Sequence, residues 1–170
     1  MNVLAIGAHP DDIELACSGT LAKCVKRGDT VIVCHVSSGN LGHVVIPPDE
    51  LQIIRANEAK KAGAMAGIEV IWGGFHDLDI YDNNKEARDK LVDVIKYANP
   101  DFIIITGDVV YGEFDDAGTS LVSLINFMDS FQIPWSPVFG NHDNESVKGV
   151  DWQCAQLEAA EHCLFRRGDV

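Results

Sequence analysis

The sequence predicts an α/β fold with one Rossmann-like open parallel sheet and helices on both faces. Short apolar runs carry no polar alternation, as expected of parallel strands that are covered on both sides. Amphipathic segments of helical length separate these runs, so strands and helices alternate along the chain. At 170 residues the chain is most simply one domain that spans 1–170.

The first half of the chain contains three of the expected strands, at residues 3–6, 31–34 and 70–72. Helices are expected at 12–26 and 49–66, with Asp11 or Asp12 and then Asp49 as N-terminal caps. Gly28 and Gly67 each follow a predicted helix and precede a strand, as a C-terminal glycine does.

The second half continues the alternation with strands at 102–105 and 135–139 and helices at 84–98, 116–131 and 151–163. Asn83 or Asn84 is the expected cap of the helix at 84–98. Open α/β sheets bind ligands at the carboxyl ends of their strands. The loops that follow the strands are therefore the places to search for chemistry.

The charge, the apolar runs and the cysteines of the sequence exclude several kinds of binding partner and location. The formal net charge of -13 disfavours nucleic acid and anionic membranes, because both attract basic surfaces. Apolar runs are only of strand length, and the N-terminus begins with a strand pattern in place of a signal peptide. The five cysteines form no CxxC pair and lie in apolar segments, which is typical of reduced thiols in a cytoplasmic protein.

The loop after the first strand carries the clearest chemical motif, Ala8-His9-Pro10-Asp11-Asp12. His9 and Asp12 supply a nitrogen and an oxygen, which suit zinc or a related divalent ion. Asp11 points away from Asp12 because adjacent side chains diverge, which leaves it available as a general base. The alternative, two helix-capping aspartates beside an incidental histidine, is disfavoured by the full motif with Glu14.

With these features residues 1–106 resemble the PIG-L/LmbE-like family of zinc-dependent N-acetylglucosaminyl deacetylases. The resemblance extends through residues 19–22 and 36–40, the helix residues Arg55 and Glu58, and residues 75–78. It implies zinc ligation by His9 and Asp12, with Asp11 as the general base acting on a zinc-bound water, and a sugar-like substrate. It also implies that Arg55 helps to bind substrate, with a solvated helix arginine as the alternative. Asp77 is a candidate substrate contact because it follows the third strand.

The family completes its zinc site with a histidine after the fourth strand, and this sequence has none there. Residues 107–116 read Gly-Asp-Val-Val-Tyr-Gly-Glu-Phe-Asp-Asp. Asp116 falls at one of the expected histidine positions and could act as an oxygen ligand. The resemblance therefore predicts an incomplete active site in which zinc, or another divalent ion, binds weakly or not at all.

Residues 100–170 resemble a fragment of a different family, the calcineurin-like metallophosphoesterases. The matching segments are Phe102 to Gly112 and the Gly-Asn-His-Asp motif at 140–143. This resemblance implies metal or phosphate contacts from Asp108, Asn141 and His142, and hard oxygen ligands suit a two-metal centre. That family's opening Asp-x-His motif and its later Gly-His-x-His motif are missing.

Two metallohydrolase patterns therefore meet at the strand around residues 100–106, as they would in a chimera of the two families. The leading hypothesis is a metal-dependent hydrolase derived from an N-acetyl amino-sugar deacetylase. One alternative is a recombined or designed scaffold without catalytic activity, and a second is a phosphoester hydrolase. Replacement of the C-terminal part would expose apolar surface, so a homo-oligomer is a further expectation.

Overall fold

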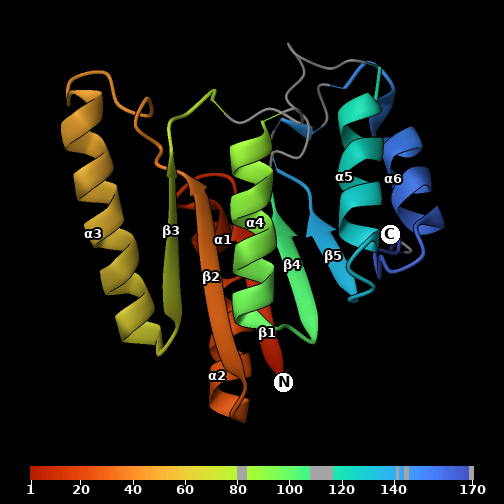
Figure 1. Cartoon of the computed structure of the whole chain (residues 1–170), viewed down its shortest axis with the longest axis horizontal. Helices are drawn as coiled ribbons and strands as arrows, with labels where there is room; N and C mark the ends of the chain where they lie inside the picture. The colour runs from red at the N-terminus through yellow and green to blue at the C-terminus, as the bar shows by residue number, and fades with distance from the viewer. Residues whose placement is uncertain (80–83, 108–116, 141, 144–145, 169–170) are drawn as a thin grey trace.

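The computed structural model describes residues 1–79, 84–107, 117–140, 142–143 and 146–168. Its centre is a parallel sheet of five strands in the order β3-β2-β1-β4-β5 (Figure 1). The strands are β1 (Asn2–Gly7), β2 (Thr30–Ser37), β3 (Glu69–Phe75), β4 (Phe102–Thr106) and β5 (Trp135–Val138). This confirms the predicted fold class, and both parts of the chain contribute strands to the same sheet.

The helices follow the predicted alternation, with differences at several ends. They are α1 (Asp12–Ala16), α2 (Ser18–Arg27), α3 (Pro48–Ala66), α4 (Lys85–Ala98), α5 (Thr119–Asp129) and α6 (Gly149–Ala159). Asp49 was an expected cap, but α3 begins one residue earlier with Pro47 at the N-cap, so Asp49 lies inside its first turn. The helix expected at 12–26 is split at Cys17, whose φ of -143° leaves the helical region. The last helix ends earlier than predicted because Ala160 turns to an extended conformation.

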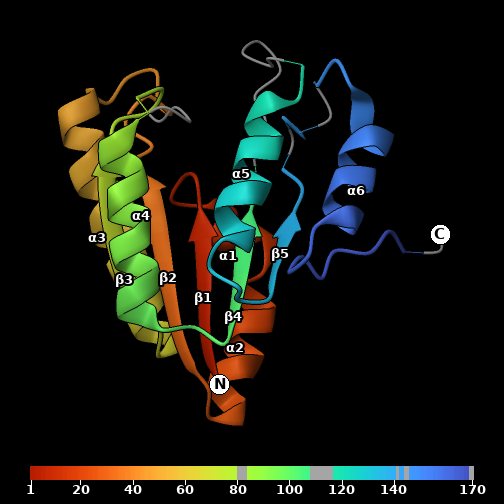
Figure 2. The ribbon, with the colours of Figure 1, turned by 45° about the vertical axis from the view of Figure 1, so that its right-hand side comes forward.

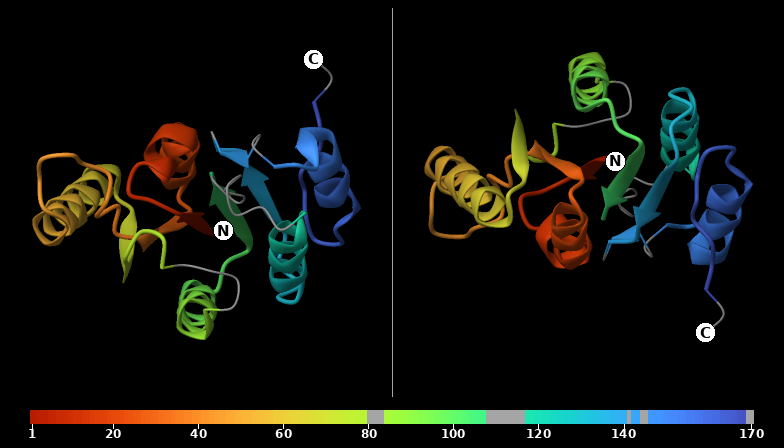
Figure 3. Two further views of the ribbon diagram at one scale, coloured as in Figure 1. Left: turned by 90° about the horizontal axis from the view of Figure 1, so that it is seen from above. Right: turned by 90° about the horizontal axis from the view of Figure 1, so that it is seen from below.

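The two faces of the sheet have separate cores, as the view along the strands shows (Figure 3). One core joins odd positions of β1 and β2 to α1 and α2, and α3 lies on this side against β3. The larger core joins the even positions of β1 and β2 to α4, α5 and α6. Strands covered on both faces explain why the apolar runs show no alternation.

Past α6 the chain returns to the outer edge of the sheet (Figure 2). The Trp135 N–H donates to the His162 carbonyl at 3.0 Å, and the Leu164 N–H donates to the Trp135 carbonyl at 2.7 Å. These bonds form an isolated parallel bridge between Trp135 and Cys163. The bridge shields part of the β5 edge, which explains why the helical pattern stops before residue 163.

Strand order determines where a ligand can enter. The chain runs outward from β1 to β2 and β3 in one direction, and β4 and β5 continue on the other side of β1. The carboxyl ends of β1 and β4 therefore flank the topological switch point, where open α/β sheets bind ligands. In the described part of the chain no helix is long and apolar enough to cross a membrane.

Candidate functional site

His9 and Asp12 lie together at the switch point, between the end of β1 and the first turn of α1. The backbone N–H of His9 donates to Asp12 Oδ2 at 2.8 Å, and His9 Nδ1 is 3.7 Å from the same oxygen. Burial opposes ionisation of Asp12, but the contacts with His9 outweigh it and lower the pKa of this carboxyl. The pair thus presents an ionised carboxylate beside an imidazole, which is the charge state that a divalent ion requires.

A cavity of about 280 Å³ opens beside Asp12. The residues that line it come from α1 and from the ends of β4 and β5: Asp12, Leu15, Ala16, Gly107, Val138, Phe139 and Gly140. Gly107 has φ +65°, and a Cβ there would lie 3.6 Å from the Asp12 carboxyl and from the Gly140 Cα. The loops that follow β4 and β5 therefore both begin next to Asp12.

Asp11 is held on the other side of the motif by Arg55 from α3. Arg55 Nη2 is 3.1 Å from Asp11 Oδ2 and donates to the Pro10 carbonyl at 3.3 Å, while Nη1 donates to the Gly39 carbonyl at 3.1 Å. Asp11 was an expected helix cap, but its side chain makes no capping hydrogen bond. Its carboxylate instead pairs with Arg55 and stays largely exposed, so a water molecule can reach it.

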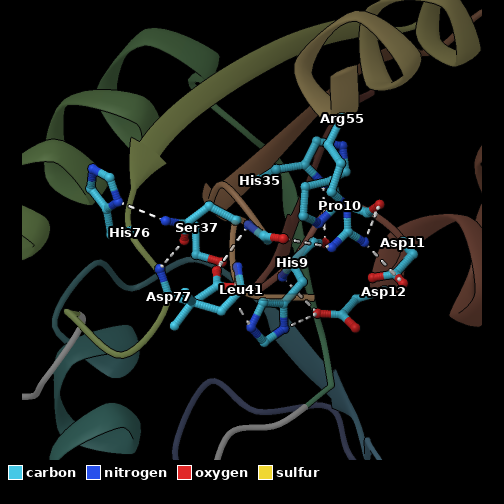
Figure 4. A network of polar contacts seen from close by, with 12 residues as sticks. His9, Pro10, Asp11, Asp12, His35, Ser37, Leu41, Arg55, His76 and Asp77 are labelled. Carbon is cyan, nitrogen blue, oxygen red and sulfur yellow. Dashed lines mark hydrogen bonds and ion pairs between the residues drawn. The ribbon is translucent and has the colours of Figure 1, made fainter. Parts of the chain in front are cut away.

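Asp77 joins the end of β3 to the loop after β2 (Figure 4). Its Oδ1 accepts from Ser37 Oγ and from the Gly39 N–H, both at 2.9 Å, and its Oδ2 accepts from the Leu41 N–H at 3.0 Å. Oδ1 also lies 4.0 Å from His9 Nε2. Both carboxylate oxygens are therefore engaged within the protein, and contact of Asp77 with substrate stays a prediction.

Asn40 was not singled out as a functional side chain, although it closes the same network. Its side-chain oxygen accepts from the Asp77 N–H at 2.9 Å, and its amide nitrogen lies 2.7 Å from His76 Nδ1. The side chain is almost completely buried. Its sequence signals were its position in the loop that follows a strand and its place in the segment 36–40 that resembles the family.

His35 lies buried on β2 beneath the site, one residue past the strand predicted at 31–34. Its Nδ1 is 3.4 Å from the His9 carbonyl oxygen, and its Nε2 is 3.5 Å from Glu14 Oε1. Burial lowers the pKa of the His35 imidazole, although the charge of Glu14 opposes the change. Glu14 thus has a structural partner inside the protein, which the motif alone did not reveal.

Of the four remaining predicted ligands, only His142 lies among the described residues. Asp108, Asp116 and Asn141 lie outside the described residues. His142 is described and lies half-buried in the loop after β5, where its neighbour Asp143 accepts from the Gly140 N–H at 2.6 Å. Over the described ranges no group of three or more His, Cys, Asp or Glu side chains is positioned to hold a metal ion.

Among the described residues, two side chains are suitable as ligands for a divalent ion. His9 and Asp12 offer the nitrogen and oxygen that zinc accepts, at a separation that one ion can bridge. A stable site needs at least one further protein ligand, and Gly107, the last described residue before the gap after β4, lies next to the Asp12 carboxyl.

Comparison with known families agrees with this arrangement. Residues 4–116 match the PIG-L family, described as GlcNAc-PI de-N-acetylase. The chain belongs to the PIG-L family. The matched segment runs from within β1 to beyond β4 and includes the described residues of the network around His9, Arg55 and Asp77. A second match, to the calcineurin-like phosphoesterases, covers residues 73–167 and overlaps the first.

The individual relatives are likewise of two kinds, deacetylases and phosphatases. The uncharacterized deacetylase YaiS of Escherichia coli is 33% identical over 99 residues, which are 58% of this chain and 50% of YaiS. The probable inactive purple acid phosphatase 28 of Arabidopsis thaliana is 43% identical over 55 residues, 32% of this chain and 14% of that protein. The chain thus spans half the length of YaiS and much less of the phosphatase.

Solved structures share the fold. A deacetylase triple mutant of the teicoplanin biosynthetic pathway aligns with a TM-score of 0.64 at 21% identity, over 79% of this chain and 62% of that one. The N,N'-diacetylchitobiose deacetylase of Pyrococcus horikoshii aligns with a TM-score of 0.60 at 22% identity, over 84% and 52%. At this identity the likeness shows the fold.

Proposed function

We propose that this chain is a metal-dependent hydrolase of the deacetylase type, which removes the acetyl group from an N-acetylated amino sugar. The observation that supports this most is the His9–Asp12 pair at the switch point, with Asp11 held beside it by Arg55. The PIG-L match and the names of YaiS and of the chitobiose deacetylase support the same class of reaction.

Each residue of the motif then has a separate role. His9 and Asp12 would hold a divalent ion, preferably zinc, which supplies Lewis acidity and lowers the pKa of water. Asp11 would take the proton from the attacking water, because its carboxylate is exposed to solvent and held beside the His9–Asp12 pair by Arg55. The polar loops after β2 and β3 provide hydrogen-bonding groups that suit a sugar.

The site is incomplete relative to the family, and we propose that Asp116 or Asp108 supplies the third ligand. Two carboxylates and one imidazole bind zinc less selectively than a site with a second histidine. The family's histidine after the fourth strand would also assist the leaving group, and its absence predicts slow turnover. Weak metal binding and low activity are thus parts of the same proposal.

The test is acetate release from N-acetylglucosamine and diacetylchitobiose by the zinc-loaded chain. Asp11→Asn should reduce the rate by about 100-fold or more, since general-base catalysis contributes at least that much. Asp89→Asn, an exposed α4 carboxylate paired with Lys85, is the matched control and should leave the rate unchanged. Equal rates for Asp11→Asn and the wild type would refute the assigned role.

Phosphoester hydrolysis is the second candidate because Gly107 and Gly140, which open the two phosphoesterase-like loops, lie against each other. Manganese-dependent hydrolysis of p-nitrophenyl phosphate that His142→Ala abolishes would favour it over deacetylation. Absence of both activities would favour the third alternative, a folded scaffold that retains the motifs of two families.

We also propose that the chain joins parts of two families at β4, where their matches overlap over residues 73–116. Both families place a functional loop after such a strand, so the junction preserves the sheet and its polarity. The five cysteines are all free, which suits the cytoplasm.

A further inference from the structure

Arg55 makes more contacts with the protein than a substrate-binding arginine needs. Its guanidinium joins three separate groups: the Asp11 carboxylate, the Pro10 carbonyl and the Gly39 carbonyl. The first two belong to the loop after β1 and the third to the loop after β2. One side chain from α3 therefore bridges the two loops that form the candidate site, and only 18% of it is exposed.

The loop after β2 is shaped to receive this guanidinium. A Cβ at Gly39 would lie 2.2 Å from Arg55 Nη1, and a Cβ at Gly42 would lie 3.0 Å from the same atom. Gly39 also has φ +64°, a conformation that other residues adopt only with strain. The missing side chains of Gly39 and Gly42 thus leave the space that the Arg55 guanidinium occupies. This indicates that the loop is shaped to hold Arg55 in this position.

The same loop is fixed from its other side by Asp77. The Asp77 carboxylate accepts from the N–H groups of Gly39 and Leu41, while the Gly39 carbonyl faces Arg55. The peptide groups around Gly39 are therefore held between an anion and a cation. This arrangement makes the loop a rigid support for Arg55, and Arg55 in turn limits the orientations of Asp11.

We infer that Arg55 is a positioning residue, which fixes the Asp11 carboxylate and couples the loop after β1 to the loop after β2. Its catalytic consequence rests on the proposed function, in which Asp11 is the general base. Asp11 is 55% exposed and would otherwise sample several rotamers. Restricting it to one orientation raises the fraction of molecules in which it faces the attacking water.

Coupling can be tested without any activity, through amide hydrogen exchange of Gly39 and Leu41. Arg55→Met keeps the length of the side chain but removes its donors, so exchange at these amides should accelerate by about 10-fold. Asp11→Asn, on the other loop, should accelerate the same amides by about 3-fold. In an Arg55→Met background Asp11→Asn should have no further effect, because the connection is already lost.

Arg167→Met is the matched control, because Arg167 also pairs with a carboxylate and a carbonyl, both of Asp151, but lies near the C-terminus. It should leave exchange at Gly39 and Leu41 unchanged. If Arg55→Met does not fold, Arg55→Lys retains the charge and should give a smaller acceleration. Unchanged exchange in the Arg55 variant, or an Asp11→Asn effect that persists in its background, would overturn the inference.

Kinetics separate positioning from substrate binding once turnover is measured. A positioning role predicts that Arg55→Met lowers kcat by about 10- to 100-fold with KM unchanged. A rise in KM with kcat unchanged would contradict the inference and assign Arg55 to the substrate. If the wild type releases no acetate the proposed function fails, and the exchange experiment still decides whether Arg55 couples the loops.

Discussion

Two aspartates at opposite ends of the sheet perform the same structural task. Asp77, at the carboxyl end of β3, accepts from Ser37, Gly39 and Leu41. Asp129, at the end of α5, accepts from the indole of Trp135 and from the N–H groups of Glu161 and His162. Only Asp77 lies near the motif at His9, with 4.0 Å between Asp77 Oδ1 and His9 Nε2, so the two carboxylates differ in their distance from the candidate site.

Removing either carboxylate should have a large effect on stability. We expect Asp129→Ala and Asp77→Ala each to lower the free energy of unfolding by about 2–3 kcal/mol, because three donors lose their acceptor. Urea denaturation measures this. Only Asp77→Ala should also weaken zinc binding, and a loss of zinc affinity in Asp129→Ala would break the distinction between the two regions.

The contribution of Asp129 should depend on pH. Burial opposes its ionisation, but the hydrogen bonds from Trp135, Glu161 and His162 outweigh it and lower the pKa of the carboxyl. The associated stability is thus fully present above about pH 5, and it is lost as pH falls through the ordinary carboxyl pKa of about 3.9 toward the lowered folded value. The stability difference between wild type and Asp129→Asn should shrink over that range, and a constant difference would contradict the assignment.

A smaller effect is expected at two helix glycines of the deacetylase-like part. A Cβ at Gly63 in α3 would lie 2.3 Å from Val70 Cγ2 and 2.8 Å from the Ile68 carbonyl, whereas Gly19 in α2 has nothing within 4 Å. Gly63→Ala should destabilise by about 1–2 kcal/mol, and Gly19→Ala should stabilise by about 0.5 kcal/mol. Thermal unfolding checks both signs, and equal shifts would show that α3 is not packed closely on β3.

The sequence was sufficient for the fold because its signals were local. Unalternated apolar runs marked the five strands, and the glycines at 28 and 67 are left-handed helix ends as predicted. Of the expected caps, Asn84 accepts from the Ala87 N–H, but Asp11 pairs with Arg55 across 44 positions of the chain. Such a tertiary contact has no local sequence signal. The same holds for the three hydrogen bonds that Asp129 accepts from Trp135, Glu161 and His162.

The candidate site could be predicted only in part for a related reason. His9, Asp11 and Asp12 are adjacent in sequence, and their motif placed them correctly at a strand end. The positions of Arg55 and Asp77 relative to them follow from strand order, which periodicity does not determine. The sequence therefore identified these residues as candidates but not the hydrogen bonds that engage them.

Zinc content is the most direct test of the central claim that the deacetylase-like half retains a metal site. Equilibrium dialysis over a rising series of zinc concentrations, followed by elemental analysis, should approach about one ion per wild-type chain at the highest concentrations, as a weak single site requires. A His9→Ala/Asp12→Ala variant that remains folded by circular dichroism should bind none, while a His162→Ala control should match the wild type. Equal zinc binding by the double variant and the wild type would contradict the account.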